Sequence, residues 1–363
     1  MASALENVAW ESCLIDPRPD RALEGYARRK IGMPHPSIRY FTAVPWLARA
    51  LVDLRAEYGL LMHLDQGVAD ILNLIVSREN SCRFCYAATR MMLRAQGMSE
   101  TRIARLEQNL GTPDGPGPRA AAVIAFGRAQ SRTGPAGARE AREALRHAGC
   151  GEDELKEIAF AVAMADFFNR LHSIPAISAR AMERMPDFLP MRLLGPLLNH
   201  VMVRRRQRGQ AAAPARPPLY PYARLVEAYA GSPIAPTLAA TIEGLWASPL
   251  LSRRCKLLML AVVARGLGCA ACADEIAAAL EREGMSQAVL AQVLTHLDAA
   301  ELDATERLLV RFTRETIWFE PATLQRRARA LREQLAVPQL VEAIGVASLA
   351  NGLCRMGAMV LEH

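Results

Sequence analysis

Aromatic residues make up only 6% of this 363-residue chain, and the alternation of valine, isoleucine and threonine that marks β-strands is scarce. Alanine, leucine, arginine and glutamate dominate instead, and all four are residues that favour helices. A hydrophobic fraction of 51% beside 22% charged residues is typical of a globular protein. The sequence therefore predicts an all-α protein that is long enough for two domains, each with a core.

Long apolar runs are missing too, since no stretch reaches the roughly 18 consecutive apolar residues that a membrane-spanning helix needs. The first residues, "MASALENVAWESC", carry early glutamates and lack the apolar centre of a secretory signal. We therefore expect a cytoplasmic protein, where structural disulfides are disfavoured. A glycine-rich phosphate loop is also absent, so no organic cofactor is expected.

The net charge of +7 permits anionic partners without requiring them. A basic block at 204–208 follows the apolar stretch 188–203 and precedes a proline-rich segment. It has no interleaved aromatic residues, so a nucleic-acid partner is not expected. The simplest interpretation is a solvated linker. An amphipathic element on a membrane surface is disfavoured, because Gly195 and Pro196 interrupt the helix.

Two Cys-x-x-Cys motifs are what the sequence does offer. Cys82 and Cys85 lie in "SRENSCRFCYAATRMML", and Cys269 and Cys272 lie in "ARGLGCAACADEIAAAL". Placing Cys82 over Cys269 aligns the two halves of the chain, and a Gly-Met-Ser tripeptide then recurs after each motif. Further on, "DELKEIAFAVAMADFFNRL" parallels "PQLVEAIGVASLANGLCRM". The chain is therefore predicted to contain a duplicated helical unit.

The duplication sets the expected domain boundaries. Residues 35–203 form repeat one and residues 225–363 form repeat two, and we expect the repeats to pack as a pseudo-symmetric pair. Between them, residues 204–224 form a basic, proline-rich linker in which a continuous helix is forbidden. Residues 1–34 form an N-terminal arm to which the sequence assigns no role.

Helical spacing places Cys82, Cys85 and Thr89 on one face of a helix. Cys82 would lie in the first turn, behind Asn80 and Ser81, where free backbone N–H groups and the helix dipole favour a thiolate. A thiolate is the nucleophile that attacks a peroxide or a disulfide, and a second sulfur then resolves the product. The pair is therefore predicted to be redox-active.

Two other interpretations of the first motif remain open, namely buried structural thiols and metal ligands. A four-thiolate zinc site is disfavoured, because zinc ribbons keep their cysteine pairs about 15 to 20 residues apart, much closer than here. A thioredoxin fold is excluded, because its motif follows a strand. Zinc is therefore not an expected cofactor.

The CxxC at a helix start, the Gly-Met-Ser tripeptide and the later helix with "FFNRL" or "ANGLCRM" resemble the alkylhydroperoxidase D and carboxymuconolactone decarboxylase superfamily. The resemblance covers both repeats. It implies two tandem all-helical units and a thiol-dependent peroxidase or disulfide reductase that acts on a hydroperoxide or a disulfide. It further implies a thioredoxin-like or lipoyl-bearing protein as reductant, a homo-oligomer, and no cofactor beyond the dithiol.

In the peroxidase members an acidic residue precedes the first cysteine and a histidine follows the second. Asp70 lies at the acidic position here, but Thr89 replaces the histidine, and a threonine cannot change its charge near pH 7. His63 and His172 are candidates to supply the missing proton carrier, because they adjoin the matching segments. The resemblance implies that Cys85 attacks and Cys82 closes the disulfide, whereas the helix-start argument favours Cys82 as the more acidic thiol.

Repeat two departs further from this pattern. Leu257 occupies the acidic position and Ile276 the histidine position, and nearby carboxylates would raise the thiol pKa values. Cys269 and Cys272 are therefore expected to be a vestigial or structural pair. Two alternative functions stay open: a non-enzymatic scaffold or redox-sensing module whose proton relay has decayed, and a decarboxylase-like enzyme of the same superfamily.

Overall fold

The computed structural model describes most of the chain. The described parts are residue 5 and residues 8–33, 35–108, 117–133, 138–180, 216–218 and 220–361. Within them helices are the only regular secondary structure, which confirms the all-α prediction. The basic block at 204–208 and the apolar stretch before it lie outside the described residues, so their interpretation stays a prediction.

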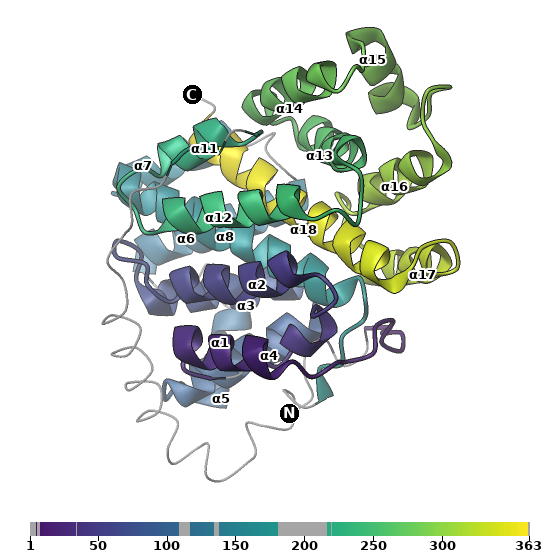
Figure 1. Ribbon diagram of the computed structural model, residues 1–363. Coiled ribbons are helices and arrows are strands. Elements are labelled where there is room, and N and C mark those ends of the chain that lie inside the picture. The colour runs from purple at the N-terminus through teal and green to yellow at the C-terminus, as the bar shows by residue number, and fades with distance from the viewer. Residues whose placement is uncertain are drawn as a thin grey trace.

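Among the residues that the structure describes, eight α-helices and one 3₁₀ turn precede the linker (Figure 1). They are α1 (Arg21–Ile31), η1 (Ile38–Tyr40), α2 (Pro45–Tyr58), α3 (Gln66–Glu79), α4 (Arg83–Ala95), α5 (Glu100–Gln108), α6 (Gly117–Thr133), α7 (Ala138–His147) and α8 (Glu152–Ser173).

Eight α-helices follow it within the described residues. They are α11 (Ala223–Ala228), α12 (Ile234–Ala247), α13 (Arg253–Leu267), α14 (Ala270–Arg282), α15 (Gln287–His296), α16 (Ala304–Glu315), α17 (Pro321–Arg332) and α18 (Val337–Val360). Figure 1 places the two CxxC helices, α4 and α14, in different parts of the molecule.

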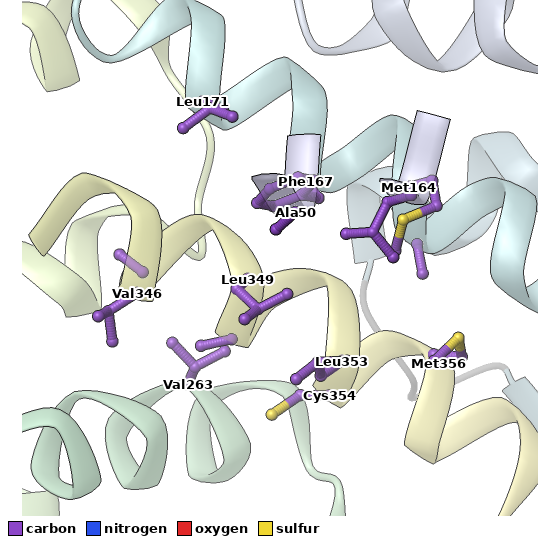
Figure 2. Packing of buried hydrophobic residues seen from close by; sticks show 14 of the residues in the cluster. Ala50, Met164, Phe167, Leu171, Val263, Val346, Leu349, Leu353, Cys354 and Met356 are labelled. Atoms are coloured by element: carbon purple, nitrogen blue, oxygen red, sulfur yellow. The ribbon is translucent and has the colours of Figure 1, made fainter. Parts of the chain in front are cut away.

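Helices α8 and α18 form the centre of the fold and pack directly on each other. In Figure 2 Met164 and Phe167 of α8 lie across from Leu349 and Leu353 of α18, and all four side chains are fully buried. Burying each such side chain stabilises the fold by about 1.5–3 kcal/mol. Gly352 allows the close approach, because a Cβ there would lie 3.0 Å from the carbonyl oxygen of Ala163.

Helix α18 is also long and apolar enough to cross a membrane by length and composition, with a mean hydropathy of 1.3 over its best window. The sequence analysis expected no such segment. The whole of that window is buried inside the fold, so its apolar character is accounted for by its place in the core.

Helices α8 and α18 each carry a buried glutamate at an equivalent position. Each glutamate binds the loop that precedes a pair of helices with a CxxC motif between them. The Glu157 carboxylate accepts the backbone N–H of Leu64 at 2.7 Å, just before α3. The Glu342 carboxylate accepts the backbone N–H of Leu251 at 2.7 Å, just before α13, and it also pairs with Lys256 at 3.4 Å. In the alignment of the two halves Glu157 corresponds to Glu342 and Leu64 corresponds to Leu251, so the two contacts are equivalent.

Buried arginines extend this correspondence across the central interface. Arg170 of α8 donates to the carbonyl of Thr316 at 2.8 Å, and Arg355 of α18 donates to the carbonyl of Gln130 at 3.3 Å, so each reaches into the other half. Asp166 accepts from Arg170 at 2.8 Å and lies 3.4 Å from Arg355. Reciprocal contacts of this kind are what a two-fold pair makes. They support the predicted duplication, which itself stays a prediction.

The Asp166 carboxylate is the only negative charge that the described contacts place between these two arginines. We expect Asp166→Ala to lower the free energy of unfolding by about 3–5 kcal/mol, because it leaves two buried guanidinium groups uncompensated. Urea denaturation measures this change. Asp298→Ala removes an exposed partner of Arg307 and Arg311 and is the matched control, since exposed ion pairs contribute little. Equal effects of the two substitutions on the free energy of unfolding would contradict the role of Asp166 as the charge that compensates both arginines.

Candidate functional site

Cys82 is the N-cap residue of α4. Its backbone is extended, at φ −82° and ψ 93°, and its sulfur accepts the backbone N–H of Cys85 at 3.4 Å. The preceding turn is fixed by Asn80, whose side-chain amide donates to Asp166 at 3.1 Å, and by Ser81, which has a positive φ of 50°. Cys82 is fully buried and Cys85 is 7% exposed. Both are free thiols, and the fold therefore encloses the pair at a helix start.

The two thiols have opposite electrostatic environments. Burial raises the pKa of Cys82, but hydrogen bonds from the Cys85 thiol and from the backbone N–H groups of Cys85 and Phe84, together with the polar side chain of Ser173, outweigh it and hold that pKa below its usual value. Burial, the hydrogen bond to Cys82 and the negative charge on Cys82 raise the pKa of Cys85 well above the usual thiol value. Cys82 is thus the more acidic thiol, in agreement with the helix-start argument.

His172, on α8, is the imidazole that the fold brings to this pair. Its Nδ1 lies 3.4 Å from the Cys85 sulfur and 2.6 Å from the carbonyl oxygen of Phe168. A carbonyl only accepts, so Nδ1 carries the proton and Nε2 is free to accept from the Ser37 hydroxyl at 2.8 Å. Burial lowers the pKa of His172 to about 4, and the ring is therefore neutral at pH 7.

Phe84, between the two cysteines in sequence, positions this imidazole. Its ring stacks on that of His172 with the centroids 4.4 Å apart and the planes inclined by 14°. The ring of Phe41 meets the same imidazole edge-on at 6.3 Å. The residue between the cysteines therefore contributes a stacking surface for the proton carrier.

The other predicted site residues lie elsewhere. Asp70 is buried on α3, and its carboxylate accepts from Gln66 at 3.1 Å and from Gln96 at 2.7 Å. Gln96 is the C-cap of α4, so this contact lies about 16 Å along the helix from Cys85, at ~1.5 Å per residue. Thr89 is buried on α4, one turn beyond Cys85.

His63 is exposed, and its backbone N–H donates to Glu157 near the start of α8. His172 lies in the last turn of the same helix. About 15 residues of helix, or ~22 Å, separate the two ends. Of the two histidines that the sequence singled out, the structure brings only His172 to the dithiol.

Two residues that the sequence analysis did not single out complete the hydrogen-bonded group. Ser37 is fully buried beside η1, and its hydroxyl lies between His172 and the Nδ1 of His35, 3.0 Å away. His35 itself is half-buried. Both belong to the segment "PHPSIRY", where no periodicity or motif points to a site, so no sequence signal indicated them.

The second motif repeats the backbone geometry of the first. Cys269 is the N-cap of α14 at φ −79° and ψ 93°, and its sulfur accepts the backbone N–H of Cys272 at 3.4 Å. Here, however, a disulfide joins the two sulfurs, which the sequence analysis did not expect. Gly357 packs on this disulfide, because a Cβ there would lie 2.6 Å from the Cys272 sulfur and 3.1 Å from the Cys269 sulfur.

The alignment of α8 with α18 places Gly357 at the position of His172. The same position of the fold therefore carries an imidazole beside the free dithiol and a bare backbone beside the disulfide. No side chain fits at Gly357 without displacing a sulfur. The second pair consequently has no proton carrier at this position.

A cavity of about 430 Å³ adjoins the first site through Arg83, the residue after Cys82. The N-terminal arm forms one wall of it: Trp10 donates its indole N–H to the carbonyl of Ile177 at 3.3 Å, and Leu14 donates its backbone N–H to Pro175 at 2.9 Å. Its volume is in the range of small-molecule sites. Among the described residues, no group of three histidine, cysteine or acidic side chains is placed to hold a metal ion.

No family model matches the chain, and neither a curated protein nor a solved structure does. The superfamily resemblance of the sequence therefore stays a resemblance. The function of the site is inferred below from its own chemistry.

The two cysteine pairs should differ in accessibility to reductant. We expect dithiothreitol and iodoacetamide, applied to the native protein, to alkylate Cys85, which is 7% exposed, and to leave the Cys269–Cys272 disulfide intact, because both of its sulfurs are buried and Gly357 packs on them. Mass spectrometry of the two cysteine-containing peptides measures the alkylation. As a control, unfolding the protein before reduction should lead to labelling of all four cysteines. Native labelling of Cys269 or Cys272 at the rate of Cys85 would contradict the sealed disulfide.

Proposed function

We propose that the protein is a thiol-dependent reductase of hydroperoxides or disulfides and that the Cys82–Cys85 dithiol performs the reaction. The observation that carries the proposal is a free dithiol at the start of α4 with the Nδ1 of His172 3.4 Å from the Cys85 sulfur, and the thiol pKa directions, downward at Cys82 and upward at Cys85, agree with it. A lowered thiol pKa is the requirement for a nucleophile at neutral pH. Structural thiols in a core have no need of it, and a thiol beside an imidazole is a frequent redox arrangement.

Cys82 is the attacking sulfur in this proposal. Its thiolate attacks the outer oxygen of a hydroperoxide, a sulfur–oxygen bond forms, and the oxygen–oxygen bond breaks to release an alkoxide that takes up a proton as the alcohol. Cys85 then attacks the sulfenic acid, a disulfide forms, and water leaves. The dithiol loses two electrons and the peroxide gains them. This order of roles is the reverse of the one that the resemblance implies.

An external dithiol returns the enzyme to its starting state. It attacks the Cys82–Cys85 disulfide through a mixed disulfide and leaves oxidised, so that two electrons return to the protein. A thioredoxin-like or lipoyl-bearing protein has the required chemistry. The second cysteine pair has no part in this cycle, and repeat two serves to complete the central packing of α8 on α18.

One observation favours a second candidate function. Cys82 is fully buried, which restricts the approach of any substrate larger than hydrogen peroxide unless the arm moves. A dithiol that is oxidised once and not readily reduced would make the protein a redox-sensing module rather than a catalyst. The number of turnovers separates the two functions.

Peroxide consumption in the presence of excess dithiol reductant tests the proposal. Wild type should consume many equivalents of peroxide per chain. Cys82→Ser should reduce the rate to the background of the reductant, because the nucleophile is lost. When the reductant is left out, Cys85→Ser should consume one equivalent of peroxide and retain Cys82 as a sulfenic acid, since the resolving sulfur is missing.

Cys150→Ser is the matched control, since this cysteine lies before α8, has a raised pKa because of burial, and should leave turnover unchanged. A single equivalent consumed by wild type would favour the redox sensor. Full activity in Cys82→Ser would overturn both functions.

A further inference from the structure

We propose that His35 and Ser37 deliver a proton from solvent, through His172, to the oxygen that leaves when the dithiol reduces a peroxide. The inference deepens the proposed function and rests on it. Neither His35 nor Ser37 lies in a helix that carries the cysteines; they belong to the segment that links the N-terminal arm to α2. They would be positioning and proton-transfer residues, while Cys82 and Cys85 do the sulfur chemistry.

The proposed reaction needs such a route because it takes up one proton. The reduced site starts as one thiolate and one thiol, and hydroperoxide reduction gives a disulfide, an alcohol and water. Balancing these requires one proton from outside in every cycle, which the later reduction by an external dithiol returns. Cys82 is fully buried and Cys85 is 7% exposed, so bulk water reaches the pair poorly.

At His172 and Ser37 the donors and acceptors are ordered in the direction that delivery requires. The Nδ1–H of His172 points to the sulfur side, because the Phe168 carbonyl at 2.6 Å and the Cys85 sulfur at 3.4 Å are its acceptors. When that proton is given up, Nε2 can take a new one from the Ser37 hydroxyl at 2.8 Å. His35 Nδ1 lies 3.0 Å from the Ser37 oxygen and accepts the Ser37 backbone N–H at 3.4 Å, so it replaces the Ser37 proton only after the His35 ring has itself taken up a proton.

The largest exposure along the route is at its far end. Cys85 is 7% exposed, His172 is 2% exposed and Ser37 is fully buried, whereas His35 is half-buried. The rings of His35 and His172 are nearly parallel, with a 19° inclination and centroids 6.3 Å apart. Ser37 therefore fills the gap between two imidazoles, one at each end of a short path from water to sulfur.

The hydroxyl of Ser37 is not occupied by a local structural task. Ser37 is the N-cap residue of η1, the position where a serine ordinarily accepts a backbone N–H, yet its side chain makes no capping hydrogen bond. Its hydroxyl instead contacts the two imidazoles. A neutral imidazole can take a proton at one nitrogen and release one at the other, as delivery requires.

Single-turnover disulfide formation by hydrogen peroxide tests the route in the full-length protein. We expect Ser37→Ala and His35→Ala to slow formation of the Cys82–Cys85 disulfide by about 10- to 100-fold, with an altered solvent deuterium isotope effect. Added imidazole should restore much of the rate in His35→Ala, where the half-buried end is vacated, and little of it in Ser37→Ala. His147→Ala, on the exposed end of α7, is the matched control and should behave as wild type.

The outcomes separate this inference from the proposed function. If wild type forms no disulfide with peroxide, the proposed function fails. If wild type forms it and both variants match its rate and isotope effect, only the proton route is overturned. A slowed His35→Ala that imidazole does not rescue assigns a structural role and also overturns the route. Should Ser37→Ala fail to fold, as judged by circular dichroism, His35→Ala with imidazole rescue decides the question alone.

Discussion

A negative charge on a buried sulfur has to be compensated by hydrogen-bond donors, and the arrangement around Cys82 follows from that constraint. The start of α4 supplies backbone N–H groups and Cys85 supplies its thiol, while the polar side chain of Ser173 on α8 adds to their effect. None of these donors carries a full positive charge. The thiolate is therefore stabilised by oriented dipoles and not by an ion pair, so its pKa depends on how precisely α4 and α8 are held together.

Helix α8 links this chemistry to the stability of the fold. One turn before His172 and Ser173 it carries Arg170, which pairs with Asp166 and reaches the carbonyl of Thr316 in the other half. Asp166 also accepts from Asn80 in the turn before Cys82. The ionic centre between the two halves and the dithiol thus share a helix and a loop. A shift of α8 along α18 would disturb both.

The sequence was sufficient for the helical class, the CxxC helix start and one of the two candidate imidazoles. These depend on local pattern, because residue spacing places Cys82 at a cap, and His172 adjoins a repeated segment. The sequence was not sufficient to place Asp70. The superfamily spacing predicted this residue near the cysteines, but its carboxylate accepts a hydrogen bond from Gln96 at the other end of α4. Spacing along one helix does not specify which part of a neighbouring helix it contacts.

Contacts between distant segments were the other limit. Ser37 meets His172 from a short connecting segment, and Gly357 meets a disulfide from the far end of α18. A lone serine or glycine gives no signal in a single sequence. The tertiary fold alone reveals that equivalent positions of α8 and α18 carry an imidazole in one half and no side chain in the other.

The acidity of Cys82 is the central claim, and the ultraviolet absorbance of the thiolate followed against pH tests it most directly. The account predicts that the first thiolate appears below the ordinary thiol pKa of 9.0, disappears in Cys82→Ser and persists in Cys85→Ser. A first thiolate that forms only at or above that value, or one that survives the loss of Cys82, would contradict it.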